Sequence, residues 1–526
     1  MSYANGRNQP ALDNDRTKDL EHRRQRVLAG GGEARQAKQR QQGKWTARQR
    51  LAALYDEGTF QELGMFVEHR SAEFGMDQAD APGDGVVTGF GQVDGRLVYA
   101  FAQDFTVLGG SLGEMHARKV HVVQDLALKS GAPIVAMADS GGARIQEGID
   151  SLNGYGEIFR RNTMASGVIP QISVIVGPSA GGAVYSPALT DFVLMAEGIG
   201  QMYITGPQVI KAVTGEDVSH EALGGAQTHA RKSGVAHLTF VDETALMAGL
   251  KRLLGYLPSN NLAQPPAHPA AEPEAGAVQG LDQVVPDDPN KPYDVRQLIL
   301  GLTDQDSFLE LQPAYAQNMV IGFGRLAGRV VAWCANQPRI LAGCLDIDAS
   351  DKLARFVRFA DAFNLPLLTL IDTPGYLPGT AQEYGGIIRH GAKVLYAYSE
   401  ASVAKISVVL RKAYGGAYLA MCSKSLGADL VLALPTAEIA VMGPEGAANI
   451  IFRAQIEAAA DQDATRKRLV AEYRDRFSSP YVAAARQYVD QVVTAGELRH
   501  ALIAALWALG EKSEDRPAKK HGNIPL

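Results

Sequence analysis

Several features that would point to a particular chemistry are scarce or missing in this sequence. Its 526 residues include only three cysteines, Cys334, Cys344 and Cys422, and no Cys-x-x-Cys pair. A disulfide framework, a zinc ribbon and a thioredoxin-type site are therefore excluded. The N-terminus also lacks the apolar segment of a signal peptide. Together these absences predict a reduced, cytoplasmic protein.

The sequence motifs of metal sites, nucleotide-binding sites and hydrolases do not predict a function either. No His-Glu-x-x-His sequence or histidine cluster predicts a metal site, so we expect no metal. The stretch GGIIRHGAK (385–393) has Ala392 where a Walker A loop needs lysine, which excludes ATP binding by that route. Support for nicotinamide binding is weak, because GFGQVDG (89–95) does not follow the Gly-x-Gly-x-x-Gly spacing. Ser-His-Asp hydrolysis is not expected.

No long apolar run has the character of a membrane helix. Residues 162–190 contain no charged side chain, but Pro170, Pro178 and Pro187 interrupt them. A spanning helix needs about 20 mostly apolar residues without such breaks. We therefore interpret 172–176 as a buried strand followed by a loop and a helix start.

Charge is distributed unevenly along the chain. The net charge is −6, yet residues 1–50 hold 12 Lys and Arg against 5 Asp and Glu. A basic arm of this kind could touch nucleic acid or a membrane. Because Glu, Asp and Gln interleave the basic residues, as on a solvated helix face, we predict neither partner.

A segment rich in Pro, Ala and acidic residues divides the chain. Residues 258–294 show little periodicity and are typical of a solvated linker. The predicted domains are therefore 1–257, which includes the basic helical arm, and 295–526.

The two halves resemble each other. VTGFGQVDGR (87–96) matches VIGFGRLAGR (320–329) at an offset of 233, and the same offset pairs Lys119 with Lys352 and Asp139 with Asp372. A period this long is not a solenoid repeat, so we infer two copies of one domain. In each copy, buried apolar strands alternate with helices, which predicts an α/β fold with parallel pairing. The strands are expected at 134–138, 172–176, 367–371 and 405–410, and the helices at 117–130 and 349–363.

Glycine is abundant, with 55 residues, and one glycine motif occurs in both halves. Gly181-Gly182-Ala183 and Gly415-Gly416-Ala417 each lie between a buried strand and a predicted helix. The first amides of a helix lack intrahelical acceptors and carry the positive end of its dipole. Such a loop suits a developing oxyanion, for example that of a thioester enolate. The alternative is that the glycines only allow close packing of helix and strand.

A second glycine loop, SGGARIQEG (140–148), follows another predicted strand. It could form a phosphate cradle or part of a substrate wall. A solvated turn with an ion pair between Arg144 and Glu147 is an equal alternative.

These residues resemble a known family, the carboxyltransferase (β) subunits of biotin-dependent acyl-CoA carboxylases. The resemblance covers the chain from about residue 17 to its end. The segments that carry it are DFTVLGGSLGEMHARKV, DSGGARIQEG, GPSAGGAVYSPALTDF, ANQPRILAGCLDIDASDK, QEYGGIIRHGAK, RKAYGGAYLAM, EIAVMGPEGAANIIFR and KKHGNIPL. It implies two crotonase-like (ClpP/crotonase) domains and a homohexamer built as a trimer of dimers, with each active site at a dimer interface.

The resemblance also implies roles for residues of both halves. The acyl-CoA would lie on the N-terminal domain of one subunit and carboxybiotin against the C-terminal domain of another. Released CO2 would be attacked by the enolate after biotin N1 takes the α-proton. The implied sites are Gly181 and Gly182 for the thioester oxyanion, Gly416 and Ala417 for the ureido oxygen of biotin, Gly142, Ala143 and Leu419 for the substrate, and Gly415 and Tyr418 on the biotin side.

The expected function is carboxyl transfer from carboxybiotin to a short acyl-CoA, most simply propionyl-CoA to methylmalonyl-CoA. Biotin would be carried by a partner α subunit with biotin carboxylase activity, because this chain has no biotinylation sequence or ATP-grasp region. Leu419 stands where many propionyl-specific relatives carry Asp, so a methylmalonyl-CoA transcarboxylase or decarboxylase subunit is an alternative. Further alternatives are a biotin-independent hydratase using Glu147 and a non-enzymatic scaffold for the α chain.

Overall fold

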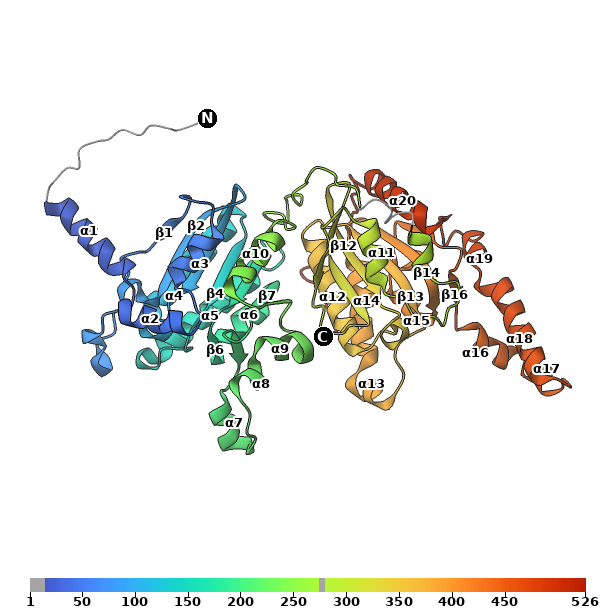
Figure 1. Cartoon of the computed structure of the whole chain (residues 1–526), viewed down its shortest axis with the longest axis horizontal. Coiled ribbons are helices and arrows are strands. Elements are labelled where there is room, and N and C mark those ends of the chain that lie inside the picture. Colours follow the sequence, from blue (N-terminus) through green and yellow to red (C-terminus); the bar gives the residue numbers. More distant parts are fainter. Residues whose placement is uncertain (1–14, 274–279) are drawn as a thin grey trace. The chain divides into compact units, whose positions relative to one another are not determined.

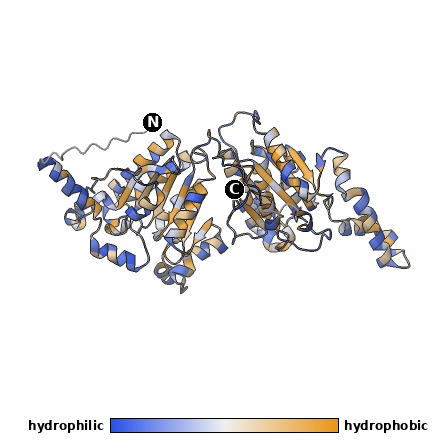
Figure 2. Ribbon diagram, turned by 45° about the horizontal axis from the view of Figure 1, so that its top comes forward, coloured by the Kyte–Doolittle hydropathy of each residue, from blue (hydrophilic) through white to orange (hydrophobic). Residues whose placement is uncertain are grey.

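The computed structural model describes residues 15–273 and 280–526, which form two compact units (Figure 1). Unit 1 comprises the chain up to Ala226 together with Thr239–Lys251, and unit 2 comprises Gln227–Leu238 and Arg252–Leu526. Each unit is built on its own sheet, and the strands are among the most hydrophobic ribbons of the molecule (Figure 2).

The unit 1 sheet has the strand order β1-β2-β3-β4-β5-β7-β9. The first three strands pair antiparallel, and β3, β4, β5 and β7 pair parallel. The strands are β1 (Gln61–Leu63), β2 (Val86–Val93), β3 (Arg96–Gln103), β4 (Ile134–Ala138), β5 (Gln171–Ile175), β7 (Phe192–Ala196) and β9 (Leu238–Phe240).

The unit 2 sheet repeats this plan in the order β10-β11-β12-β13-β14-β15-β17, with β16 added beside β14. The strands are β10 (Leu309–Leu311), β11 (Met319–Leu326), β12 (Arg329–Asn336), β13 (Leu367–Thr373), β14 (Lys405–Tyr414), β15 (Leu430–Ala433), β16 (Glu438–Ala440) and β17 (Gln491–Val492).

Strand register is also shared between the two units. Val87 pairs with Ala102 in unit 1, and Val320 pairs with Ala335 in unit 2, so both partners are shifted by the same 233 positions. The isolated bridge between Leu112 and Ala143 has its counterpart, at the same offset, between Leu345 and Tyr376. The repeat inferred from the sequence is therefore a repeat of structure, and the α/β class is confirmed.

Helices cover the sheets and bury their apolar faces. In unit 1, α4 (Glu114–Ser130) packs on α5 (Gly148–Ala165) and on β3. In unit 2, α12 (Ile347–Ala362) packs on α14 (Ile387–Glu400), while α11 (Val295–Leu302) and α20 (Ala495–Ala508) share a buried core with the strands. The helices α4 and α12 begin two or three residues earlier than predicted. In α12 the reason is a cap, because the side chain of Asp346 accepts from the Ala349 amide.

The N-terminal arm consists of two dissimilar parts. Helix α1 (Asp15–Leu28) is strongly hydrophilic and almost wholly exposed. The segment after α2 (Glu33–Gln41) is different, because Lys44, Arg50 and Leu51 are buried in unit 1 around α3 (Ala47–Leu54).

The segment 258–294 is not simply a solvated linker. Among its described residues, Leu281, Val285 and Tyr293 are buried in the core of unit 2. Nearer its start, the His268 amide donates to the Gly328 carbonyl at 3.0 Å. Within residues 15–273 and 280–526, no helix combines the length and apolar character needed to span a bilayer.

Candidate active site

The first glycine loop follows β5 in unit 1. Here β6 (Pro178–Ala180) pairs with β8 (Gln201–Tyr203), and the short helix η5 (Gly181–Val184) begins immediately after it. Gly181 has a φ of 60°, a left-handed conformation that explains the glycine. Its amide donates to the Ile204 carbonyl at 3.1 Å, so it is already engaged. The amide of the next residue, Gly182, stays a predicted oxyanion donor.

Tyr155 of α5 lies against this loop. A Cβ at Gly182 would come within 3.1 Å of the Tyr155 ring. Burial raises the pKa of the Tyr155 hydroxyl to about 12, so this group stays neutral. The surrounding sequence SLNGYG (151–156) gave no signal for this residue, because a buried aromatic in a helix usually belongs to the core.

The second glycine loop, in unit 2, forms a helix start without an intervening strand. Helix α15 (Gly415–Ala420) follows β14 directly, and no side chain caps it. Gly415 has a φ of 57°, matching Gly181. A Cβ at Gly416 would meet no atom within 4 Å. The first-turn amides of α15, including those of Gly416 and Ala417, lack intrahelical acceptors.

Two further predicted residues also lie on α15: Leu419, predicted for the substrate, and Tyr418, predicted on the biotin side. Leu419 is 43% exposed, so an apolar side chain is presented at the surface beside the loop. Tyr418 is half-buried, and desolvation raises the pKa of its hydroxyl to about 12. Neither side chain is charged at neutral pH.

Gly142 and Ala143 lie beside the first loop. Gly142 has a φ of 96°, and a Cβ there would lie 3.2 Å from the Ala180 carbonyl oxygen. The Gly142 amide donates to the Ser140 hydroxyl at 3.0 Å, which fixes the turn. Unit 1 therefore brings together Gly142, Ala143 and Gly182 from the ends of two neighbouring parallel strands.

Arg144 and Glu147 form neither a solvated turn nor a phosphate cradle. Their side chains are 2% and 6% exposed and pair at 2.7 Å. Arg144 also pairs with the buried Asp84 at 2.7 Å, and Glu147 accepts from the Glu114 amide at 2.6 Å. Both side chains are held in buried ion pairs and hydrogen bonds, so Glu147 is not free to activate water as a hydratase would require.

The sequence GPSAG (177–181) matches the Gly-x-Ser-x-Gly pattern of hydrolases. Ser179 is fully buried, and its hydroxyl has no hydrogen-bond partner among the described residues. A nucleophile of this kind has to be exposed and bonded to a base. The serine is therefore no nucleophile elbow.

The chemistry of both loops rests on backbone amides. GPSAGGAVYS (177–186) and YGGAYLA (414–420) contain no Asp, Glu, His, Lys or Arg. Nor do the parts of the chain that are described bring together three or more metal-ligating side chains. Each loop is suited to hold one oxygen atom on helix-start amides, and a base would have to come from a substrate.

Comparison with known proteins assigns this arrangement to a family. Residues 38–524 match the model of the carboxyl transferase domain. The chain belongs to the carboxyl transferase family. It is 56% identical to the methylmalonyl-CoA decarboxylase subunit alpha of Propionigenium modestum, with 97% of this chain and 98% of that protein covered. It is also 56% identical to the propionyl-CoA carboxylase carboxyltransferase subunit of Haloferax mediterranei, covering 97% and 99%.

A solved structure of a family member has the same fold. Transcarboxylase 12S, crystallised as a hexamer assembly with methylmalonyl-CoA and methylmalonic acid bound, matches with a TM-score of 0.95 at 53% identity, covering 99% of this chain and 100% of that one. The predicted family and the two crotonase-like domains are confirmed, and the chain is an enzyme of the carboxyltransferase class. The roles assigned to individual glycines stay predictions.

Proposed function

We propose that this chain is the carboxyltransferase subunit of a biotin-dependent acyl-CoA carboxylase, and that it carboxylates propionyl-CoA to methylmalonyl-CoA. The observation that carries the proposal is the duplicated pair of Gly-Gly-Ala helix starts. One reaction that needs two such sites is the transfer of a carboxyl group from a carboxylated ureido group to the α-carbon of a thioester that reacts as its enolate. Relatives named as propionyl-CoA carboxylase subunits, at 56% identity, support the substrate.

In this proposal unit 1 holds the acyl-CoA and unit 2 holds carboxybiotin, carried by a partner chain. The Gly182 amide, beside Gly142 and Ala143, stabilises the thioester oxyanion. The Gly416 and Ala417 amides hold the ureido oxygen, and the open space at Gly416 fits a flat group approaching closely. Carboxybiotin supplies the carboxyl group, and no side chain of either loop is needed as the base.

Assembly into a homohexamer is part of the proposal. Apolar side chains are exposed on equivalent elements of both units: Val213 is 78% exposed on α7 (Pro207–Thr214), and Ile450 is 67% exposed on α16 (Pro444–Ile451). Exposed apolar patches of this kind mark protein interfaces. The transcarboxylase relative is itself a hexamer.

A second candidate is the carboxyltransferase subunit of a methylmalonyl-CoA transcarboxylase or decarboxylase. It is favoured by Leu419, by the 56% identity to the decarboxylase subunit alpha and by the match to transcarboxylase 12S. Both candidates use the same two loops in opposite directions.

The test is reconstitution with a biotin carboxylase and a biotinylated carrier protein. With ATP, bicarbonate and propionyl-CoA, the first proposal expects methylmalonyl-CoA to form, with a higher kcat/KM than malonyl-CoA formation from acetyl-CoA. Failure to carboxylate any acyl-CoA, combined with decarboxylation of methylmalonyl-CoA in the presence of biotin, would favour the second candidate.

A further inference from the structure

Two buried aspartates occupy equivalent positions, one behind each glycine loop. Asp139 and Asp372 are 0% exposed. The amide of each donates to a side-chain amide oxygen at 3.2 Å, that of Gln103 in unit 1 and that of Asn336 in unit 2. These partners differ by the same 233 positions, so the two carboxylates sit at one structural place.

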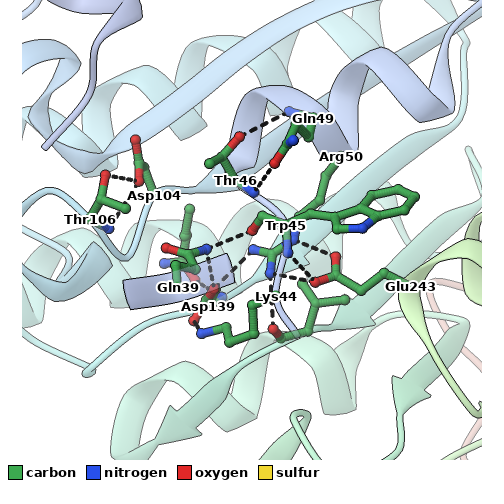
Figure 3. Close-up of polar contacts among 12 residues, drawn as sticks. Gln39, Lys44, Trp45, Thr46, Gln49, Arg50, Asp104, Thr106, Asp139 and Glu243 are labelled. Carbon is green, nitrogen blue, oxygen red and sulfur yellow. Dashed lines mark hydrogen bonds and ion pairs between the residues drawn. The ribbon is translucent and has the colours of Figure 1, made fainter. Parts of the chain in front are cut away.

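The cations that face these carboxylates come from different parts of the chain. In unit 1, Lys44 and Arg50 of the N-terminal arm contact Asp139 at 2.6 and 2.9 Å (Figure 3). In unit 2, the partner is Arg411 of β14, at 2.9 Å from Asp372. In this part of the repeat Gly415 corresponds to Gly181, an offset of 234, so the unit 1 equivalent of Arg411 is Gly177.

Gly177 explains why unit 1 needs an external cation. A Cβ at this position would lie 1.9 Å from Asp139 Oδ1, so the carboxylate packs directly on the backbone where the first loop begins. Asp139 also immediately precedes the turn of Ser140 and Gly142. It therefore joins both segments that carry the proposed acyl-CoA site.

Asp372 makes the corresponding connection in unit 2. Its Oδ1 accepts from the Lys412 amide at 3.2 Å, on the last part of the strand that leads into Gly415 and Gly416. The carboxylate thus ties the end of β13 to the strand that feeds α15.

We infer that these ion clusters are separate positioning devices, one for each substrate: Asp139 with Lys44 and Arg50 for the acyl-CoA, and Asp372 with Arg411 for carboxybiotin. The inference rests on the proposed function. A binding site holds its substrate well only when its groups are fixed to within about 0.5 Å, so loosening one loop should weaken binding of the substrate at that loop. The N-terminal arm accordingly serves the acyl-CoA site alone, through Lys44.

The test uses the full-length oligomer with methylmalonyl-CoA and free biotin, each varied in turn. The first variant is D139N/K44M, because the cluster of Lys44, Arg50, Asp139 and Glu243 stays neutral when one cation and one anion are removed together. We expect KM for methylmalonyl-CoA to rise at least fivefold while KM for biotin changes less than twofold. D372N/R411M should give the reverse pattern.

Three further variants keep the test decisive. K44M alone leaves Asp139 paired with Arg50, so it can be used if the double variant does not fold. It should also raise KM for methylmalonyl-CoA and leave KM for biotin nearly unchanged. K44R, which keeps the positive charge, should have wild-type values of both. Arg48→Met is the matched control in the same segment, since Arg48 pairs with Glu62 at 2.6 Å and not with Asp139. It should change neither KM.

The outcomes separate this inference from the proposed function. Wild-type protein that transfers no carboxyl group would contradict the proposed function itself. Active wild-type protein whose variants melt normally, and show both KM values shifted together or neither shifted, would overturn only the assignment of the two clusters.

Discussion

Gly416→Val is the most informative single change, because the structure separates its effect on folding from its effect on catalysis. Gly416 has no left-handed backbone, and a Cβ there meets no atom within 4 Å. Valine is also a better helix former than glycine. The melting temperature should therefore stay at the wild-type value within experimental error.

Catalysis should fall sharply in the same variant. In the proposed function, the valine methyl groups occupy space that the ureido oxygen needs to reach the first-turn amides of α15. Losing one oxyanion donor costs about 3–4 kcal/mol, or roughly 10²–10³ in rate. The assay is carboxyl transfer between methylmalonyl-CoA and free biotin, with the oligomeric state checked by light scattering.

Gly415→Ala is the contrasting variant. Gly415 has a φ of 57°, and its Cβ would lie 3.0 Å from the Val441 carbonyl oxygen. Forcing a left-handed conformation on alanine costs about 1–2 kcal/mol, which lowers the melting temperature by roughly 2–8 °C.

If Gly416→Val kept a third or more of wild-type activity while folding normally, the assignment of this loop would be refuted.

Three further predictions follow from particular contacts. Gly177→Ala should lower the free energy of unfolding by about 1–3 kcal/mol or more in urea titrations, since its Cβ would overlap Asp139; unchanged stability would mean that the carboxylate moves freely. Burial lowers the pKa of Lys352 from 10.5 to about 7. Between these two pH values the unfolded chain binds a proton that the folded chain has lost, so the free energy of unfolding rises with pH. Lys352→Met should remove a slope of up to about 1.4 kcal/mol per pH unit between pH 7.5 and 9.5; an unaltered slope would exclude Lys352 as its source. Leu419→Asp should lower kcat/KM for butyryl-CoA more than for acetyl-CoA, because a carboxylate is poorly tolerated beside a longer apolar chain; an equal effect on both would place Leu419 outside the acyl pocket.

The duplicated fold was predictable because its signal is local and repeated. Hairpins such as 87–96 and 320–329 keep their spacing to Lys119 and Lys352. Each of these buried lysines donates to a backbone carbonyl in the first strand of the hairpin that precedes it. Gly-Gly-Ala after a buried strand likewise marked both helix starts. These features depend on a few adjacent residues, so the sequence alone carries them.

Other features of the site depend on contacts between distant residues. The Gly181 amide is engaged because β8 brings the Ile204 carbonyl beside it, which the glycine motif itself does not reveal. Lys44 and Arg50 lie about 90 positions from Asp139, and nothing in the basic arm distinguishes them from its solvated arginines. Similarly, Val285 and Tyr293 are buried although their Pro-rich surroundings are typical of a linker.

The central claim is that this chain alone holds both an acyl-CoA site and a biotin site, and the most direct test needs no partner protein. Purified oligomer is incubated with methylmalonyl-CoA, with and without free biotin, and propionyl-CoA is followed by chromatography. The account predicts that propionyl-CoA forms only with biotin and that Gly416→Val abolishes its formation. Propionyl-CoA formed equally well without biotin, or not formed at all, would contradict it.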